Sequence, residues 1–299
     1  AMGGRLLKRW VLLPLTDLKQ IHARNQAVSW FYSSPSSTQA IRELLSNCGD
    51  LERLISKVAV GKVNPREIRH IHRSLELIGP IKQILSEGKD NTMICELSNS
   101  FQACGELLNQ IDTTIDPTPA IAVGKGDVIK AGVNQELDEL RNISNNGKQY
   151  LQELQDREAE KTGITSLKIA FNNVFGYYIE VRNTHKDKVP SEWIRRQTLV
   201  NAERYITEEL KEYEEKILGA EAKILAIEQR LYQELLAALA IHVGVIQQNA
   251  STLARLDVLS SFAVLAKEQQ YCLPEVNDSL VIHIEEGRHP VIEKQLKSG

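Results

Sequence analysis

The stretch RRQTLVNAERYITEELKEYEEKI, from Arg195 to Ile217, changes from a basic to an acidic character within one continuous segment. Its first half, RRQTLVNAERY, is compatible with a β-strand and is predicted to be the last strand of a small module. Thr207 is a favourable N-cap, and Glu208 and Glu209 fall in the first helical turn, where the helix dipole favours carboxylates. The stretch is therefore predicted to pass from a strand into a helix at Thr207.

The helix that begins there carries apolar residues at alternating steps of four and three, the spacing of a seam between two packed helices. A matching seam, with small residues in its middle, lies earlier in the chain. We therefore expect two long antiparallel helices that pack against each other. The seam positions are Val133, Leu137, Leu140, Ser144, Gly147, Leu151 and Leu154 in the first helix, and Leu210, Tyr213, Ile217, Ala220, Ile224, Ile227 and Leu231 in the second.

Between these helices the apolar period changes to two. The segments 167–171 and 177–181 alternate apolar and polar residues, which is typical of half-buried strands, and NTHKDK (183–188) reads as a polar turn. Trp193 and Tyr205 are assigned to the small core of this module. Gly176 is predicted to allow a close backbone approach or a bulge, although a simple strand-end glycine fits the pattern equally.

The chain before the first long helix reads as a series of helices joined by short turns. Asn64, Pro65 and Glu67 form the pattern of a capping box, and the apolar stripe that follows is predicted to end at Gly79-Pro80. The segment 116–134 contains prolines and glycines and is predicted to be an ordered connection with a short strand. The fold class is therefore mainly α, with a small β-rich module inserted at the tip of two long helices.

Composition restricts the function classes. The chain has 299 residues, 42% of them hydrophobic and 25% charged, and a formal net charge of −3, so any contact with a polyanion must be local. No apolar run approaches the roughly 20 residues of a membrane span, and no signal peptide is recognisable, which favours a cytoplasmic protein. The four cysteines form no C-x-x-C pair and are expected to be reduced thiols. Without a P-loop or clustered metal ligands, we expect no catalytic site, metal or cofactor in this chain.

Charge separates the tip from the helix that leaves it. From 161 to 204 there are eight basic and four acidic residues, whereas from 205 to 234 there are four basic and eight acidic residues. A positive tip on a negative rod is the distribution expected when only the tip meets a polyanion. Two alternatives stay open. Arg195 or Arg196 can pair with Glu192 or Glu203, and the chain can be a coiled-coil scaffold whose tip binds a protein partner.

Several motifs in the same order resemble the MutS family of bacterial DNA mismatch-recognition ATPases. FNNVFGYYIEV (171–181) and RRQTLVNAERYITEELKEYEEKI resemble its clamp, and GDVIKAGVNQELDELR resembles its ascending lever helix. MGGRLLKRWVLLPLTDLKQIHARNQAV resembles the start of its core, and EEGRHPVIE resembles the threshold of its ATPase domain. The resemblance implies a core and lever domain at 1–160 and 206–271, a clamp domain at 161–205, and an incomplete start of the ATPase domain at 272–299.

The resemblance also implies a role. The Phe-x-Glu motif of the family's mismatch-reading domain and its P-loop are both absent, so the chain is expected to be an excised middle of a longer protein. In the family, two clamps of a dimer close over duplex DNA and contact its backbone, and levers connect them to the ATPase. The implied partners are duplex DNA, a second copy and a MutL-type repair protein, with ATP and Mg bound by the parent protein.

The candidate DNA-backbone residues fall into two groups. Asn172, Arg196 and Asn201 match positions that face phosphates in the family, and an asparagine amide can donate to a phosphate without adding charge. For Asn172-Asn173 a plain turn pair is the alternative. The resemblance places a lysine at the position of Val200, so this chain is expected to lack one ionic contact of the family. Charge and location alone add Arg182, Lys186, Lys188 and Arg195.

Overall fold

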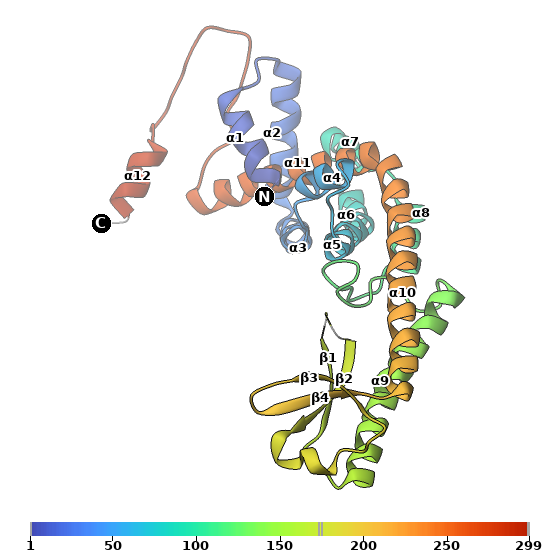
Figure 1. Ribbon diagram of the computed structural model, residues 1–299. Coiled ribbons are helices and arrows are strands. Elements are labelled where there is room, and N and C mark those ends of the chain that lie inside the picture. Colours follow the sequence, from blue (N-terminus) through green and yellow to red (C-terminus); the bar gives the residue numbers. More distant parts are fainter. Residues whose placement is uncertain (1, 173, 175, 298–299) are drawn as a thin grey trace. The chain divides into compact units, whose positions relative to one another are not determined.

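The computed structural model describes residues 2–172, 174 and 176–297 (Figure 1). Helices dominate, and one small sheet interrupts them, which confirms the predicted fold class. The helices before the sheet are α1 (Met2–Leu12), α2 (Leu18–Ser33), α3 (Pro35–Ser46), α4 (Leu51–Ala59), α5 (Pro65–Glu76), α6 (Ile78–Leu85), α7 (Thr92–Ser100), α8 (Gly105–Thr114) and α9 (Gln135–Thr162), with a short 3-10 helix η1 (Ser86–Gly88). The helices after it are α10 (Glu208–Ile241), α11 (Val243–Gln269) and α12 (Pro290–Lys297).

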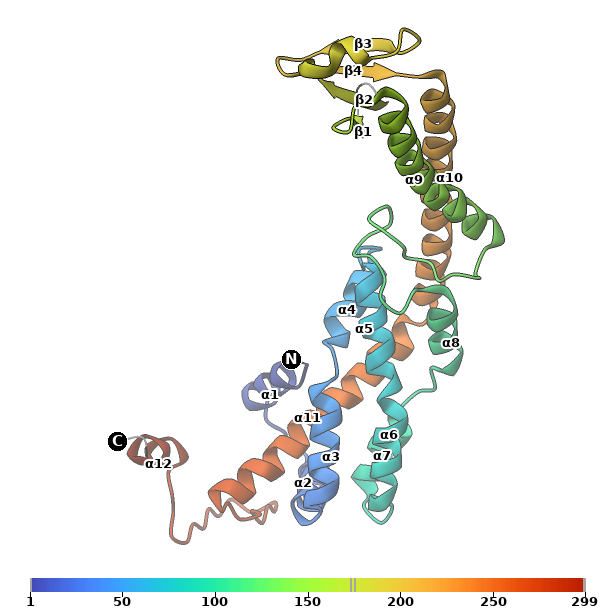
Figure 2. The same cartoon turned by 90° about the horizontal axis from the view of Figure 1, so that it is seen from below.

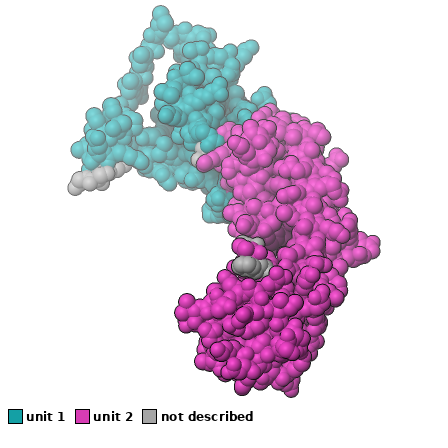
Figure 3. Space-filling model, viewed as in Figure 1, with its two compact units in different colours: residues 1–47, 79–101, 251–299 teal, residues 48–78, 102–250 magenta. Residues whose placement is uncertain are grey.

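The chain divides into two compact units (Figure 3). Unit 1 contains residues 1–47, 79–101 and 251–299, and unit 2 contains residues 48–78 and 102–250. Unit 1 is helical, with Phe31, Ile41 and Ile94 fully buried in its interior. Unit 2 holds the two long helices α9 and α10 and the sheet between them.

Side-chain caps fix several of the helix starts. Asn64 accepts from the backbone N–H of Glu67 (2.9 Å), and Glu67 accepts from the backbone N–H of Asn64 (3.0 Å), so the predicted capping box is confirmed. Thr207 caps α10 as predicted, through its hydroxyl and the N–H of Leu210. The predicted stop at Gly79-Pro80 was wrong, because α6 begins at Ile78 and Pro80 lies in its first turn, where no intrahelical N–H bond is lost.

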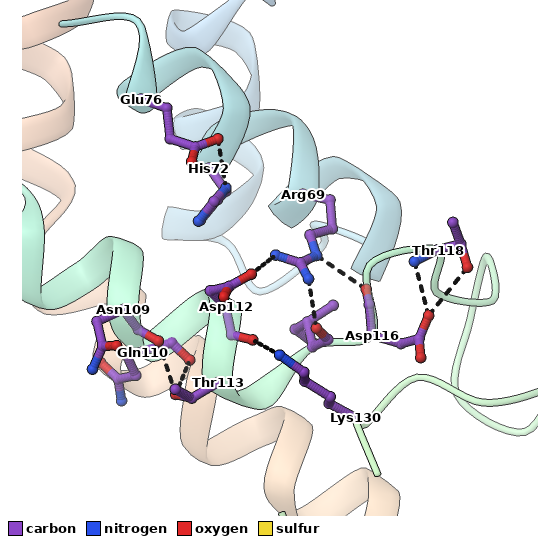
Figure 4. A network of polar contacts seen from close by, with 11 residues as sticks. Arg69, His72, Glu76, Asn109, Gln110, Asp112, Thr113, Asp116, Thr118 and Lys130 are labelled. Atoms are coloured by element: carbon purple, nitrogen blue, oxygen red, sulfur yellow. Dashed lines mark hydrogen bonds and ion pairs between the residues drawn. The ribbon is translucent and has the colours of Figure 1, made fainter. Parts of the chain in front are cut away.

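A buried arginine joins α5 to the end of α8 (Figure 4). Arg69 donates to the backbone carbonyls of Ile115 (2.9 Å) and Asp116 (3.0 Å). Its third hydrogen bond goes to the carboxylate of Asp112 (3.0 Å), and this bond is the main reason that the pKa of Asp112 is lowered. The three bonds of one planar guanidinium hold the start of the connection 115–134 against α5.

We predict that Arg69→Lys lowers the free energy of unfolding by about 1–3 kcal/mol, because a lysine cannot reproduce three divergent hydrogen bonds and leaves buried carbonyls unsatisfied. Urea denaturation followed by circular dichroism measures the change. Arg73→Lys on the same helix is the matched control, since Arg73 is exposed and no ion pair to it is found among the described residues. Equal midpoints for the two variants would contradict the assignment.

The two long helices pack antiparallel along most of the predicted seam, with the sheet between the end of α9 and the start of α10 (Figure 2). Val133 was wrongly included in the seam, because α9 begins at Gln135 and Val133 is exposed. Leu154 and Leu210 are buried near the sheet, and Ile217 and Ala220 continue the seam along α10. An aromatic pair on the same seam, Tyr150 and Tyr213, stacks with ring centroids 3.6 Å apart; the remaining buried seam residues are Leu137, Ser144, Leu151 and Ile227.

A buried carboxylate ties the connection 115–134 to both long helices. Glu228 of α10 is only 2% exposed, and its Oε1 accepts from the backbone N–H groups of Val128 (3.1 Å) and Ile129 (3.4 Å). The same oxygen accepts from Arg141 of α9 (2.7 Å). The prediction of a short strand in this connection was wrong: the connection has only an isolated antiparallel bridge, in which Ile129 pairs with Ile115.

The sheet has four antiparallel strands in the order β1-β2-β4-β3. Its strands are β1 (Lys168–Asn172), β2 (Gly176–Arg182), β3 (Ile194–Thr198) and β4 (Ala202–Ile206), and the 3-10 helix η2 (Asn183–Lys188) replaces the predicted polar turn. The prediction of one last strand in RRQTLVNAERY was wrong, because the segment folds into the β3–β4 hairpin. Its two-residue loop is Val200-Asn201, closed by the N–H of Leu199 donating to the carbonyl of Ala202 (2.8 Å).

One face of the sheet packs on the long helices. Ile179 and Tyr205 face each other in register on this face, and Trp193 lies beside Tyr205 with ring centroids 6.0 Å apart, so the predicted core assignment of the two aromatic residues is confirmed. The shared core continues into the long helices through Leu151, Leu154, Ile164, Leu167, Val181, Leu210 and Ile217. The sheet therefore has no separate core and depends on α9 and α10 for burial.

The β1–β2 hairpin is joined to α10 at a glycine. Gly176 has φ +76°, and a Cβ at this position would overlap the carboxylate of Glu214. That carboxylate accepts from the backbone N–H of Tyr177 (2.9 Å). The close backbone approach predicted for Gly176 is therefore observed, and the partner is an acidic side chain of α10.

Candidate nucleic-acid interface

The predicted contact residues lie on five different parts of the sheet region. Asn172 ends β1, Arg182 ends β2, and Asn201 lies in the β3–β4 loop. The others lie in pairs, Lys186 and Lys188 on η2, and Arg195 and Arg196 on β3. Each of these four basic side chains belongs to an exposed residue, as does Arg182.

One end of the sheet gathers several of these residues. Arg182 is in register with Ala202, so the end of β2 lies beside the β3–β4 loop. Asn183, the first residue of η2, holds that loop by donating its backbone N–H to the carbonyl of Asn201 (3.1 Å) and its side-chain amide to the carbonyl of Val200 (2.9 Å). The hairpin loop, Arg182 and the start of η2 thus form one exposed surface, with Val200 91% exposed.

Asn172 lies at the opposite end of the sheet. It is in register with Gly176, which stands six residues before Arg182 on β2, a separation of about 20 Å at the usual strand rise. The side-chain oxygen of Asn172 accepts from the backbone N–H of Val174 (2.8 Å), which is the local turn bond expected of a turn asparagine. Asn173 lies outside the described residues. The predicted residues therefore do not form a single patch.

Of the two neighbouring arginines of β3, Arg195 forms an ion pair. Its Nη1 lies 3.3 Å from Oε1 of Glu203, although the side chain of Arg195 is 61% exposed. Glu203 also accepts from the hydroxyl of Tyr205, and this hydrogen bond, followed by the charge of Arg195, lowers the pKa of Glu203. Burial and the same hydrogen bond raise the pKa of Tyr205 to about 12. Glu203 is therefore already the ion-pair partner of Arg195 and offsets part of its charge.

Arg196 occupies a β-bulge. Arg195 is paired with Tyr205 and Gln197 with Arg204, so Arg196 is the extra residue between them on the edge strand. A bulge leaves its extra residue unpaired and turns the side chain away from the regular alternation. Among the described residues no carboxylate forms an ion pair with Arg196. Its charge is therefore available for a ligand, in contrast with that of Arg195.

The basic residues of the region divide into paired and unpaired groups. Lys161 pairs with Glu192 (3.4 Å), and Arg204 pairs with Glu180 (3.0 Å) while its guanidinium lies over the ring of Tyr178 (4.2 Å to the centroid). Arg204 is therefore a structural residue, which its position in the sequence did not reveal. Within the described part of the chain, no ion pair is found for Lys168, Arg182, Lys186, Lys188 and Arg196.

Comparison with known proteins gives the family. Residues 1–263 match the family model of MutS domain III, and the chain belongs to this family. It is 55% identical over 298 residues to the DNA mismatch repair protein MutS of Bacteroides thetaiotaomicron, and 54% identical over 298 and 299 residues to those of Flavobacterium johnsoniae and Parabacteroides distasonis. Each match covers 100% of this chain and 34% of the relative, so the chain spans about a third of the length of these proteins. None of the described helices is long and apolar enough to cross a membrane.

Proposed function

We propose that this chain is the central part of a DNA mismatch repair protein and that the sheet region is a clamp that binds duplex DNA by its backbone, without sequence specificity. The family and the names of the relatives support mismatch repair. The observation that carries the clamp is the set of exposed cations around the β3–β4 loop and η2 for which the described residues offer no ion-pair partner. Surface cations attract phosphates through charge alone. Since the phosphates are the same in every DNA sequence, such contacts carry no sequence specificity.

In this proposal the residues have different parts. Arg182, Lys186, Lys188 and Arg196 supply charge, and the amide of Asn201 donates to a phosphate oxygen. Arg195 contributes less, because Glu203 already pairs with it. Asn172 contacts the DNA backbone at a second place, at the other end of the sheet. The separation of about 20 Å between Asn172 and Arg182 corresponds to roughly six base pairs, so a duplex that contacts both ends of the sheet must lie along it.

The wider assignment follows the family. Residues 161–205 are the clamp domain, 1–160 and 206–271 are the core and lever domain, and 272–299 begin an ATPase domain of the parent protein. The parent binds ATP and Mg, acts as a dimer in the cytoplasm and works with a MutL-type partner. Helices α9 and α10 are the levers, and this chain contributes DNA binding and mechanical coupling to the parent's ATPase and has no catalytic site of its own.

A salt titration tests the clamp. We expect fluorescence anisotropy to show binding of this chain to a labelled duplex at about 50 mM salt, and log K to fall by about 0.9 per log unit of salt for each phosphate neutralised. Duplexes of different sequence are expected to bind alike. Absence of binding at low salt, or an affinity independent of salt, would favour a tip that binds a protein partner instead.

The two neighbouring arginines provide a matched comparison. Arg196→Gln is expected to reduce the salt slope by about 0.9, the value for one lost phosphate contact, whereas Arg195→Gln is expected to change it less because Glu203 screens that charge. Val200→Lys, at the exposed loop, is expected to increase the slope by a similar amount, with Val200→Gln as its uncharged control. Equal effects of the two arginine variants would refute the distinction between them.

A further inference from the structure

Unit 1 contains a hollow with a volume of about 450 Å³. Its walls come from α1, α2, α7 and the start of the unit 1 part of α11. Leu6, Trp10 and Met93 form apolar parts of the wall, and Lys19, Arg24 and Arg255 contribute cationic groups. This volume lies within the range of small-molecule sites, which is about 300–1,000 Å³.

Arg255 has only a weak hydrogen-bond acceptor among the described residues. It is a half-buried residue, and Nη2 donates to the sulfur of Met93 at 3.5 Å, a weak acceptor. In the described part of the chain no carboxylate lies within ion-pair distance of it. A guanidinium carries five donors and loses solvation on burial, so an arginine with a thioether partner still requires an acceptor.

Arg24 reaches the same hollow from α2. Its guanidinium lies over the ring of Trp10, 3.5 Å from the centroid, which fixes the plane of its donors. Arg24 also has no ion pair within the described ranges. Both arginines line the same hollow, and burial lowers the pKa of each. The charge of Arg255 lowers the pKa of Arg24 further, as expected of two cations in one hollow.

The charge balance of the hollow is positive. Among the described residues that line the hollow, the carboxylate of Glu96 accompanies Lys19, Arg24 and Arg255. Its charge acts on Arg255, but no ion pair between them is found in this part of the chain. An oxyanion between the two guanidinium groups would remove their repulsion and accept their free donors. Planar guanidinium groups bind phosphate through paired hydrogen bonds, and the apolar walls leave space for more than a bare ion.

We propose that this hollow binds the phosphate group of a small phosphorylated molecule through Arg24 and Arg255, with Lys19 at its exposed edge. The proposal is independent of DNA binding by the sheet region, because the residues belong to unit 1 and none of them is a predicted DNA contact. Either a free phosphate or an organic phosphate can supply the group, and the apolar wall predicts that the organic phosphate binds more tightly.

Isothermal titration calorimetry of the whole chain tests the proposal, with inorganic phosphate, pyrophosphate and a nucleoside monophosphate as probes and acetate at matched ionic strength as the control anion. We expect saturable binding of the phosphates and weaker binding of acetate. Arg255→Gln and Arg24→Gln are each expected to weaken phosphate binding about tenfold or more, and Arg73→Gln, an exposed arginine of unit 2, is expected to leave it unchanged.

Three outcomes would overturn the site. The first is that the wild-type chain shows no saturable binding of any phosphate up to about 10 mM, and the second is that acetate binds as tightly as phosphate. The third is that Arg73→Gln weakens phosphate binding as much as Arg24→Gln and Arg255→Gln do. The binding measured for the wild-type chain decides between these outcomes even where an Arg24 or Arg255 variant fails to fold. Lys19→Gln, at an exposed residue, provides a second variant, for which we expect a weakening of about threefold.

Discussion

Glu228→Ala is expected to lower the free energy of unfolding by about 3 kcal/mol, which is a large share of the stability of a typical domain. The side chain of Glu228 is almost fully buried, and one oxygen accepts from Arg141 and from two backbone N–H groups. Removal of one partner of a buried ion pair costs about 3–5 kcal/mol, because the other charge stays buried. The lower end applies here, since Asp127 and Asp138 also lie within 4 Å of the Arg141 guanidinium.

Urea denaturation measures this loss, and Glu215→Ala is the matched control. Glu215 is an exposed glutamate of the same helix, so both variants gain the same helix propensity and only Glu228→Ala loses the buried contacts. We expect the control to change stability by less than about 0.5 kcal/mol. Glu228→Gln, which keeps an acceptor for the N–H groups of Val128 and Ile129, should fall between them. Indistinguishable denaturation midpoints for Glu228→Ala and Glu215→Ala would show that the Glu228 carboxylate does not stabilise the fold.

The long helices could be predicted because their signals are local. Caps such as Asn64 and Thr207 act on N–H groups three residues away, and the seam of α10 repeats over many turns. The helix end predicted at Pro80 was wrong because a proline breaks a helix only when it lies in the helix interior. Pro80 lies in the first turn of α6, and the sequence does not show that this helix begins two residues earlier.

The hairpin in RRQTLVNAERY could not be predicted from turn chemistry. Two-residue hairpin loops usually contain glycine or asparagine with positive φ. Gln270 and Glu286 are the described non-glycine residues with positive φ, so Val200 and Asn201 turn the chain without that feature. The strand order β1-β2-β4-β3 and the bulge at Arg196 depend on pairings between distant segments, which no local pattern contains.

The sequence predicted the positive charge of the candidate site but not how its side chains are arranged and paired. The excess of basic residues at the tip is a property of the sequence, whereas the pairing of each cation depends on strand register. Register places Glu180 opposite Arg204, and it leaves the bulged Arg196 without a partner among the described residues. It also separates Asn172 from Arg182, although both were predicted to contact the same backbone.

Gly176→Ala is expected to destabilise the attachment of the β1–β2 hairpin to α10 by about 2–4 kcal/mol. Two costs contribute. A non-glycine residue at φ +76° is strained by about 1 kcal/mol or more. The new Cβ also overlaps the Glu214 carboxylate and displaces it from the N–H of Tyr177, and a partly buried amide without a partner costs about 1–3 kcal/mol.

Gly163→Ala separates these two costs, because Gly163 has a similar φ of +66° and no atom within 4 Å of the position of its Cβ. Amide hydrogen exchange of Tyr177 and urea denaturation measure the local and global effects, and we expect the larger loss of protection and stability in Gly176→Ala. Adding Glu214→Ala to Gly176→Ala should cost little more, because the first change has already broken the contact. Equal losses in the Gly163 and Gly176 variants, or full additivity with Glu214→Ala, would show that backbone strain alone accounts for the glycine and that Glu214 does not attach the hairpin to α10.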